Sequence, residues 1–212
     1  MAPIIKVFLL ILLSSPCFSQ VIKLTYYEKK KDLEKVMVFS PEGFEIKVGS
    51  FDILFSKSLK KYYFYKENFI AEIIPQKKLS KLIVKGENKN YGCTEVLETS
   101  ETKYLAGFCI LKLDEKTESY IGGKFSLTDY FKDYYRYMVG LEVPMPMNSI
   151  PLLLTTIERK TKEVKSVEKL KKVEAVEEKS LKKRLENLDA VKNKCESVKD
   201  CFMKEKKLKG SR

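Results

Sequence analysis

The chain has 212 residues, of which 41 are Lys or Arg and 29 are Asp or Glu, so its formal net charge is +12. It contains no histidine, which excludes Ser-His-Asp and Cys-His nucleophiles, histidine general bases and histidine-ligated zinc. Hydrophobic residues make up 44% of the chain, which is enough for a folded core.

Residues 1–19 have the layout of a secretory signal peptide. Lys6 precedes an unbroken apolar run from Val7 to Leu13, and small residues, Cys17 and Ser19, stand ahead of a cleavage site before Gln20. The apolar run is much shorter than the roughly 20 residues that span a bilayer. No later segment is long and apolar enough to do so, and we therefore expect a secreted protein without a transmembrane segment.

Residues 20–142 are predicted to form a β-rich domain. Short segments rich in aromatic and β-branched residues alternate with turn signals such as Pro41-Glu42-Gly43, Gly49-Ser50 and Gly86-Glu87-Asn88. This pattern predicts an antiparallel β-sandwich or a barrel-like domain. The clearest expected strands are 21–26, 44–48, 51–55, 61–65, 69–74, 81–84 and 104–113.

One helix is expected within this domain, over Leu127–Met138, with Ser126 or Thr128 as its cap and Gly140 at its end. Tyrosines gather on it, and we interpret them with Phe131 as a buried helix face. Two alternatives are a protein-contact patch and a site of oxidative tyrosine cross-linking. The tyrosines are Tyr130, Tyr134, Tyr135 and Tyr137.

A proline-rich linker is predicted over 143–154, because three prolines in 143–151 stiffen the chain and oppose a helix. Residues 155–212 lack proline, and their Lys, Glu, Leu and Val favour helix. Apolar residues seven apart predict an amphipathic helix pair or a short coiled coil, or else a helix packed on the β domain. They are Leu181, Leu188, Cys195 and Phe202. The predicted fold class is α+β.

Without the leader, four cysteines remain, and an oxidising compartment favours two disulfides with three allowed connectivities. We favour Cys93–Cys109, which would join adjacent strands. Cys195 and Cys201 are six residues apart, or about 9 Å along a helix, which is farther than the roughly 4.4–6.8 Å between bridged Cα atoms. If this pair is bonded, the helix must break between Glu196 and Asp200; otherwise these cysteines pair elsewhere, including with another chain.

Most of the positive charge lies in the tail, where residues 155–212 include 19 basic and 11 acidic residues. A basic tail attracts polyanions through salt-sensitive contacts. In a secreted protein these are sulfated glycans, anionic lipids or acidic proteins, and no zinc or recognition-helix motif indicates nucleic acid. Two stretches match the X-B-B-X-B-X pattern of heparin-binding proteins, where B is basic. Their basic residues are Arg159, Lys160 and Lys162 in the first, and Lys206, Lys207 and Lys209 in the second.

The leader at 1–19, the lysine-rich composition without histidine or glycosylation sequons, and the Glu-Lys-Lys-Leu-Lys-Gly motif at 205–210 resemble the spore wall proteins of microsporidia. That resemblance implies a wall-associated protein whose Lys206, Lys207 and Lys209 bind host glycosaminoglycans and aid adherence. The β-rich body is not part of the resemblance.

The leading hypothesis is therefore a non-enzymatic, secreted surface protein that binds sulfated glycosaminoglycans through its basic tail, with no catalytic residue, metal or cofactor. The alternative is a structural wall or coat component that assembles with itself or other wall proteins through the tail and disulfides. An enzyme or small-ligand carrier in the β domain is the third hypothesis, and a cavity lined by converging polar groups would favour it.

Overall fold

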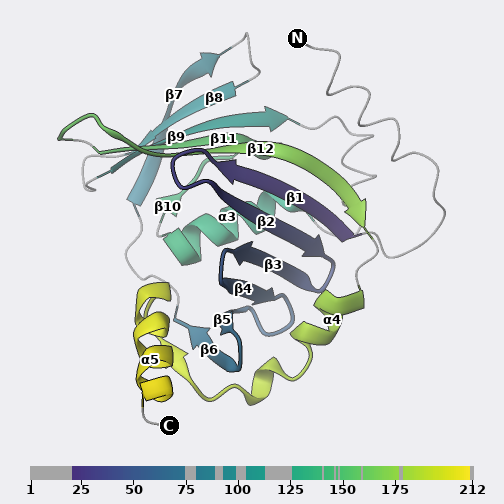
Figure 1. Ribbon diagram of the computed structural model, residues 1–212. Helices are drawn as coiled ribbons and strands as arrows, with labels where there is room; N and C mark the ends of the chain where they lie inside the picture. The colour runs from purple at the N-terminus through teal and green to yellow at the C-terminus, as the bar shows by residue number, and fades with distance from the viewer. Residues whose placement is uncertain are drawn as a thin grey trace.

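The computed structural model describes residues 21–74, 80–88, 93–98, 104–112, 126–139, 141–145, 147, 149–158, 160–176 and 179–210. The predicted leader therefore lies outside the described residues. Figure 1 shows a large twisted sheet with helices packed around it. The chain is mostly antiparallel β with a few helices, which confirms the α+β prediction.

The first six strands form a continuous antiparallel meander. They are β1 (Val21–Glu28), β2 (Leu33–Ser40), β3 (Gly43–Val48), β4 (Phe51–Ser56), β5 (Lys61–Lys66) and β6 (Phe69–Ile73). The predicted turns at Pro41-Glu42-Gly43 and Gly49-Ser50 join consecutive strands as expected. Gly43 also allows a close approach of two strands, because a Cβ there would lie 1.9 Å from the carbonyl oxygen of Phe55.

Four later strands extend the same sheet at both edges, three of them beyond β1 and one beyond β6. Among the described residues its order is β13-β6-β5-β4-β3-β2-β1-β12-β11-β9. The added strands are β9 (Tyr104–Lys112), β11 (Ser149–Glu158), β12 (Val164–Val176) and β13 (Lys194–Cys195). A smaller sheet has the order β10-β7-β8, from β10 (Leu141–Glu142), β7 (Ser80–Asn88) and β8 (Cys93–Glu98).

One face of the meander carries the main core, because alternate residues of each strand point to the same side. Phe44 and Phe39 have no exposed surface, and Tyr62 and Phe64 have almost none. Helix α3 (Leu127–Tyr134) packs on this face and continues into a π-helical turn, η2 (Tyr135–Val139).

The helix α3 confirms the expected helix and its cap, since the Ser126 hydroxyl accepts a hydrogen bond from the backbone N–H of Asp129. Tyr130, Phe131 and Tyr135 are buried, as the buried-face interpretation required. The Tyr130 ring contacts Phe44 at 5.4 Å between centroids, and its hydroxyl donates to the Ser40 carbonyl at 3.0 Å. The side chain of Tyr137 lies outside the described residues.

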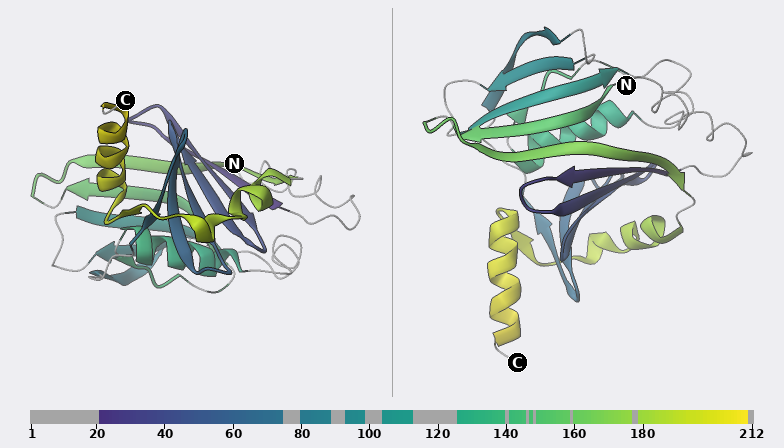
Figure 2. Two further views of the ribbon diagram at one scale, coloured as in Figure 1. Left: turned by 90° about the horizontal axis from the view of Figure 1, so that it is seen from below. Right: turned by 45° about the horizontal axis from the view of Figure 1, so that its top comes forward.

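The opposite face of the meander packs against α4 (Lys179–Leu185) and the 3-10 turn η3 (Leu188–Ala190), and Figure 2 shows α3 and α4 on opposite sides of the sheet. Leu181 and Leu188 are buried there with Leu54 and Tyr63. Arg184 forms ion pairs with the buried Glu45 and with Asp52, which compensates for removing the Glu45 carboxylate from water.

The helix predicted over the first part of the tail is wrong, because residues 149–158 and 164–176 are strands β11 and β12 of the main sheet. Apolar residues recur at every third position of β12, at Val164, Val167, Leu170, Val173 and Val176, and two of these intervals have a structural cause. Register shifts opposite Thr25/Tyr26 and opposite Thr156/Ile157 insert extra residues into β12. Such bulges bring residues three apart to one face of a strand, so Leu170 and Val173 both pack on the main core.

Two further predictions need correction. The segment 143–154, expected as a linker, ends in β11, and the main sheet contains strands from both sides of it. The turn expected at Gly86-Glu87-Asn88 lies within β7, where the register shifts between Val84 and Gly86. Sandwich packing and a coiled coil are not confirmed by the described elements. The apolar residues seven apart pack within their own chain; they are Leu181, Leu188, Cys195 and Phe202.

Candidate polyanion-binding surface

The sequence-predicted cationic residues fall on two separate parts of the molecule. Lys206, Lys207 and Lys209 lie on α5 (Val198–Gly210), and Lys160 and Lys162 lie in the turn between β11 and β12. Arg159 lies outside the described residues. Figures 1 and 2 show the turn and α5 well apart, and the two sequence matches therefore do not form one site.

A disulfide between Cys195 and Cys201 fixes the start of α5 to β13, with 5.3 Å between the two Cα atoms. The chain changes from strand to helix between the two cysteines, since β13 ends at Cys195 and α5 begins at Val198. The bond required a break in the helix between Glu196 and Asp200, and the chain is non-helical at Glu196 and Ser197, because α5 begins at Val198. Both cysteines are fully buried.

An aromatic contact anchors the middle of α5. The Phe202 ring meets Phe51 and Phe64 edge-on, with 5.0 Å between centroids in each case. The Lys66 ammonium lies 5.1 Å from the centroid of the Phe202 ring, a cation–π geometry. These contacts place one side of α5 on the main core and leave the other side in solvent.

Lys209 pairs with two carboxylates that help to hold the helix. Its ammonium lies 2.7 Å from Glu67 and 2.7 Å from Glu205. Glu205 is buried and also receives a hydrogen bond from Lys66 at 3.2 Å. Hydrogen bonds to Glu205 and Glu67 raise the pKa of Lys209, and the bonds from Lys209 and Lys66 lower the pKa of Glu205. Of the predicted triplet, Lys209 is thus the least available.

The outward side of α5 carries Lys199, Met203, Lys206 and Lys207, all exposed, and we call it the solvent face of α5. Among the described residues, none of these three lysines lies within ion-pair distance of a carboxylate. Sequence reasoning missed Lys199, although its spacing of seven from Lys206 is the signal for a shared helix face. Lysines near the C-terminus of α5 also stabilise the helix through its dipole.

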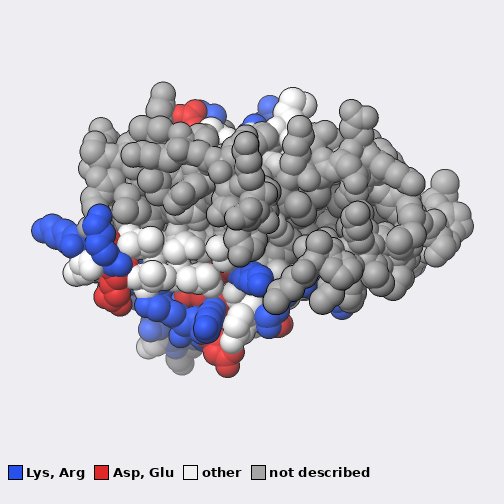
Figure 3. Space-filling view, turned by 90° about the horizontal axis from the view of Figure 1, so that it is seen from above, with Lys and Arg blue, Asp and Glu red and all other residues white. Residues whose placement is uncertain are grey.

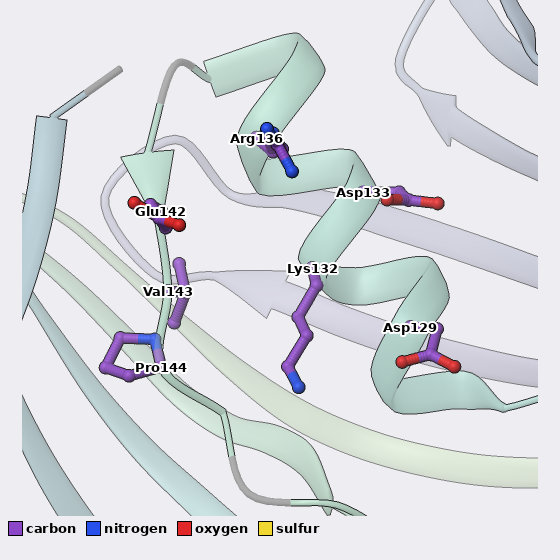
Figure 4. Close-up of a pocket in the computed structure, with 7 residues that line it drawn as sticks. All are labelled: Asp129, Lys132, Asp133, Arg136, Glu142, Val143 and Pro144. Atoms are coloured by element: carbon purple, nitrogen blue, oxygen red, sulfur yellow. The ribbon is translucent and has the colours of Figure 1, made fainter.

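A hollow lies between α3 and the segment after β10, with a volume of about 720 Å³. Figure 4 shows Lys132 extending from α3 on the side of Pro144, whereas Asp129 and Asp133 project on the other side of the helix. Burial and the nearby Asp129 raise the pKa of Asp133, and Arg136 opposes this shift. The other lining residues are Glu142 and Val143. The lining mixes both charges, which does not suit a polyanion.

On the main core side, the partly buried Lys35 pairs with the partly buried Glu168 near α3. Its ammonium also lies 5.7 Å from the centroid of the Tyr134 ring. Burial acts to lower the pKa of Lys35, but Tyr134 and Glu168 outweigh it and the pKa is raised. This pairing accounts for the buried charge and assigns it a structural role.

Cys109 is also disulfide-bonded, and its partner lies outside the described side chains, so the Cys93–Cys109 pairing stays a prediction. Within the described part of the chain, no group of cysteine and acidic residues is arranged to hold a metal ion. None of the described helices has the length and hydropathy needed to cross a membrane.

A scan against protein-family models found no match, and a search of the curated proteins found no relative. The functional assignment therefore depends on the residues and geometry of this chain.

Proposed function

We propose that the protein is a secreted, non-enzymatic surface protein that binds sulfated glycosaminoglycans through the solvent face of α5. The observation that carries this proposal is the exposure of Lys199, Lys206 and Lys207 on one side of a single helix, free of ion pairs among the described residues. Lys209 supports the site indirectly, by holding the helix against Glu67.

The geometry suits a linear chain of sulfates. Lys199 and Lys206 are two helical turns apart, which separates their backbones by about 10 Å along the axis. Lysine ammonium groups meet sulfates as point charges, without the fixed fork of arginine. The disulfide and the Phe202 contact fix the helix before binding. Less conformational entropy is then lost when the glycan binds.

In this proposal the leader directs the protein to the extracellular surface, in line with the resemblance to microsporidian spore wall proteins. Glycan binding there would attach that surface to host cells. The alternative of a coat component assembled through the tail has less support. Cys195 and Cys201 bond to each other, and Leu181 and Leu188 are buried within the same chain.

Retention on a heparin column tests the site, with two variants that remove the same charge from two helices. Lys206→Ser/Lys207→Ser removes two exposed lysines from α5, and Lys182→Ser/Lys183→Ser removes two exposed lysines from α4. We expect the α5 variant to elute at clearly lower salt than the parent, and the α4 variant to elute close to the parent. Equal losses from both would show that net charge alone retains the protein, and would contradict the assignment to α5.

A further inference from the structure

Two lysine-rich turns that are far apart in the sequence meet at one end of the main sheet. The first joins β1 to β2 and the second joins β11 to β12. Because β1 pairs with β12, with Glu28 opposite Glu168, the β1–β2 turn lies beside the first residues of β12, and the β11–β12 turn projects beyond it. The backbone N–H of Lys29 donates to the Val167 carbonyl at 3.2 Å, and the Lys30 ammonium donates to the Val164 carbonyl.

Neighbouring lysines already occupy the carboxylates at this end. Lys165 lies 3.0 Å from Glu158 and 2.7 Å from Glu163. In the first turn, Lys31 lies 3.1 Å from Glu28, and Lys30 lies 3.8 Å from Glu163 of the second turn.

The Asp32 carboxylate accepts a hydrogen bond from the Tyr27 hydroxyl. Lys29, Lys160 and Lys162 are exposed and have no carboxylate within ion-pair distance among the described residues. Positive charge is therefore left over on the outer surface of both turns.

We propose that these two turns form a second, composite binding surface for a sulfated glycan chain. We call it the two-turn lysine cluster; its members are Lys29, Lys160 and Lys162, which are unpaired among the described residues, together with Lys30 and Lys31, which pair with Glu163 and Glu28. The inference rests on the ligand class of the proposed function but not on its site. It differs from the sequence motif at 158–163, because about half of its cations come from a turn more than a hundred residues away.

A glycan fits this cluster better than a membrane surface does. A basic element that lies on a membrane also presents apolar side chains to enter it. The large exposed apolar residues among the described ones are Ile74, Met147, Met203 and Leu208, and none of them lies on either turn. Seen from above, basic side chains project along one border of the described surface, with acidic ones between them (Figure 3). Such a charged border can bind a flexible polyanion along its length.

Lys162 offers a variant that does not damage the fold. Its φ is +58°, a left-handed conformation that glycine adopts without strain. Lys162→Gly therefore removes the charge at no cost in backbone strain. Lys60 is a matched control, because it is an exposed lysine with φ +53°. It lies in the turn between β4 and β5, at the end of the meander opposite to the β1–β2 turn.

Lysine acetylation followed by mass spectrometry tests the cluster on the intact protein, with and without a heparin oligosaccharide. We expect heparin to slow acetylation of Lys29, Lys160 and Lys162 severalfold and to leave Lys60 unchanged. Lys29→Ser/Lys162→Gly should weaken heparin binding by roughly three- to tenfold, and Lys29→Ser/Lys60→Gly should weaken it less.

The outcomes separate the two sites. Protection of Lys206 and Lys207 with unchanged acetylation of Lys29 and Lys162 would overturn the two-turn lysine cluster and leave the proposed function standing. Protection of Lys29 and Lys162 without Lys206 and Lys207 would support the cluster and move the glycan site away from α5. Protection by anionic phospholipid vesicles but not by heparin would overturn the glycan assignment, and no protection by either would overturn both proposals.

Discussion

The same pattern of basic residues occurs twice in this chain, and the structure places the two copies in different settings. Residues 205–210 lie on α5, whereas residues 160–162 form a turn between two strands of the main sheet. In the helix, one of the three cations is held by Glu67 and Glu205. At the turn, Lys165, which lies outside the motif, takes up Glu158 and Glu163. A spacing pattern alone therefore does not tell which cations are available to a ligand.

The two surfaces also differ in how they are supported. The turn belongs to a hairpin in the main sheet, paired on one side to β1. The helix α5 is held by one disulfide, by the contacts of Phe202 with two aromatic rings and by the buried Glu205. Changes to the sheet should therefore affect both surfaces, and changes to the α5 anchors should affect only the helix.

The largest expected effect comes from the shared sheet. Phe44 is fully buried and contacts Phe39, Phe55, Tyr62 and Tyr130. Phe44→Ala should lower the free energy of unfolding by about 3–5 kcal/mol, and both surfaces should be lost in the same transition. Urea unfolding followed by tyrosine fluorescence and by circular dichroism measures it. A loss below about 1 kcal/mol would mean that this ring is not central to the core.

Removing the disulfide should affect α5 alone. In Cys195→Ser/Cys201→Ser the loop between the cysteines is no longer closed, which costs about 2 kcal/mol by chain entropy. Amide hydrogen exchange of α5 should become faster, and exchange at the β11–β12 turn should be unchanged. Equal acceleration at both places would show that the two surfaces are not independently supported.

Acid should loosen α5 in a third, smaller effect. The ordinary pKa values of Asp200 and Glu205 are 3.8 and 4.5, and both are lowered in the folded chain. For Asp200 the main cause is a hydrogen bond from the backbone of Glu196, and for Glu205 it is the bond from Lys209.

A carboxyl group whose pKa is lowered by folding stabilises the fold at pH values above its pKa in the unfolded chain. This stabilisation is lost as the pH falls below about 4. Amide exchange of α5, corrected for its intrinsic pH dependence, should therefore show weaker protection at pH 3 than at pH 6. Lys209→Ser should reduce this difference. An unchanged difference would mean that the ion pairs of Lys209 do not hold the helix.

Five of the six meander strands were expected from the sequence, because their segments are short, rich in aromatic and β-branched residues, and bounded by turns; β2 was not among the expected strands. Strand β12 was missed because two bulges bring apolar residues three apart to one face, which resembles a helix in sequence. Its lysines and glutamates also favour helix, and only its pairing with β1 and β11 makes it a strand. Such long-range pairing is not visible in a local pattern.

In the candidate sites too, local features could be predicted from the sequence and long-range contacts could not. The motif at 205–210 contains Lys206 and Lys207, both of which are exposed, and the six-residue spacing of the cysteines made a bond between them conditional on a break in the helix. The neutralisation of Lys209 by Glu67 was not predictable, since the two residues are 142 positions apart. The meeting of Lys29 with the β11–β12 turn depends on the β1–β12 register for the same reason.

The most direct test of the central claim is a calorimetric titration of the protein with a heparin oligosaccharide at several salt concentrations, beside a chemically desulfated oligosaccharide of equal length. The account predicts binding of the sulfated chain that weakens steeply with salt, a marked loss in Lys206→Ser/Lys207→Ser, and no measurable binding of the desulfated chain. Equal binding of both oligosaccharides, or binding by the Lys206→Ser/Lys207→Ser variant as tight as by the parent, would contradict it.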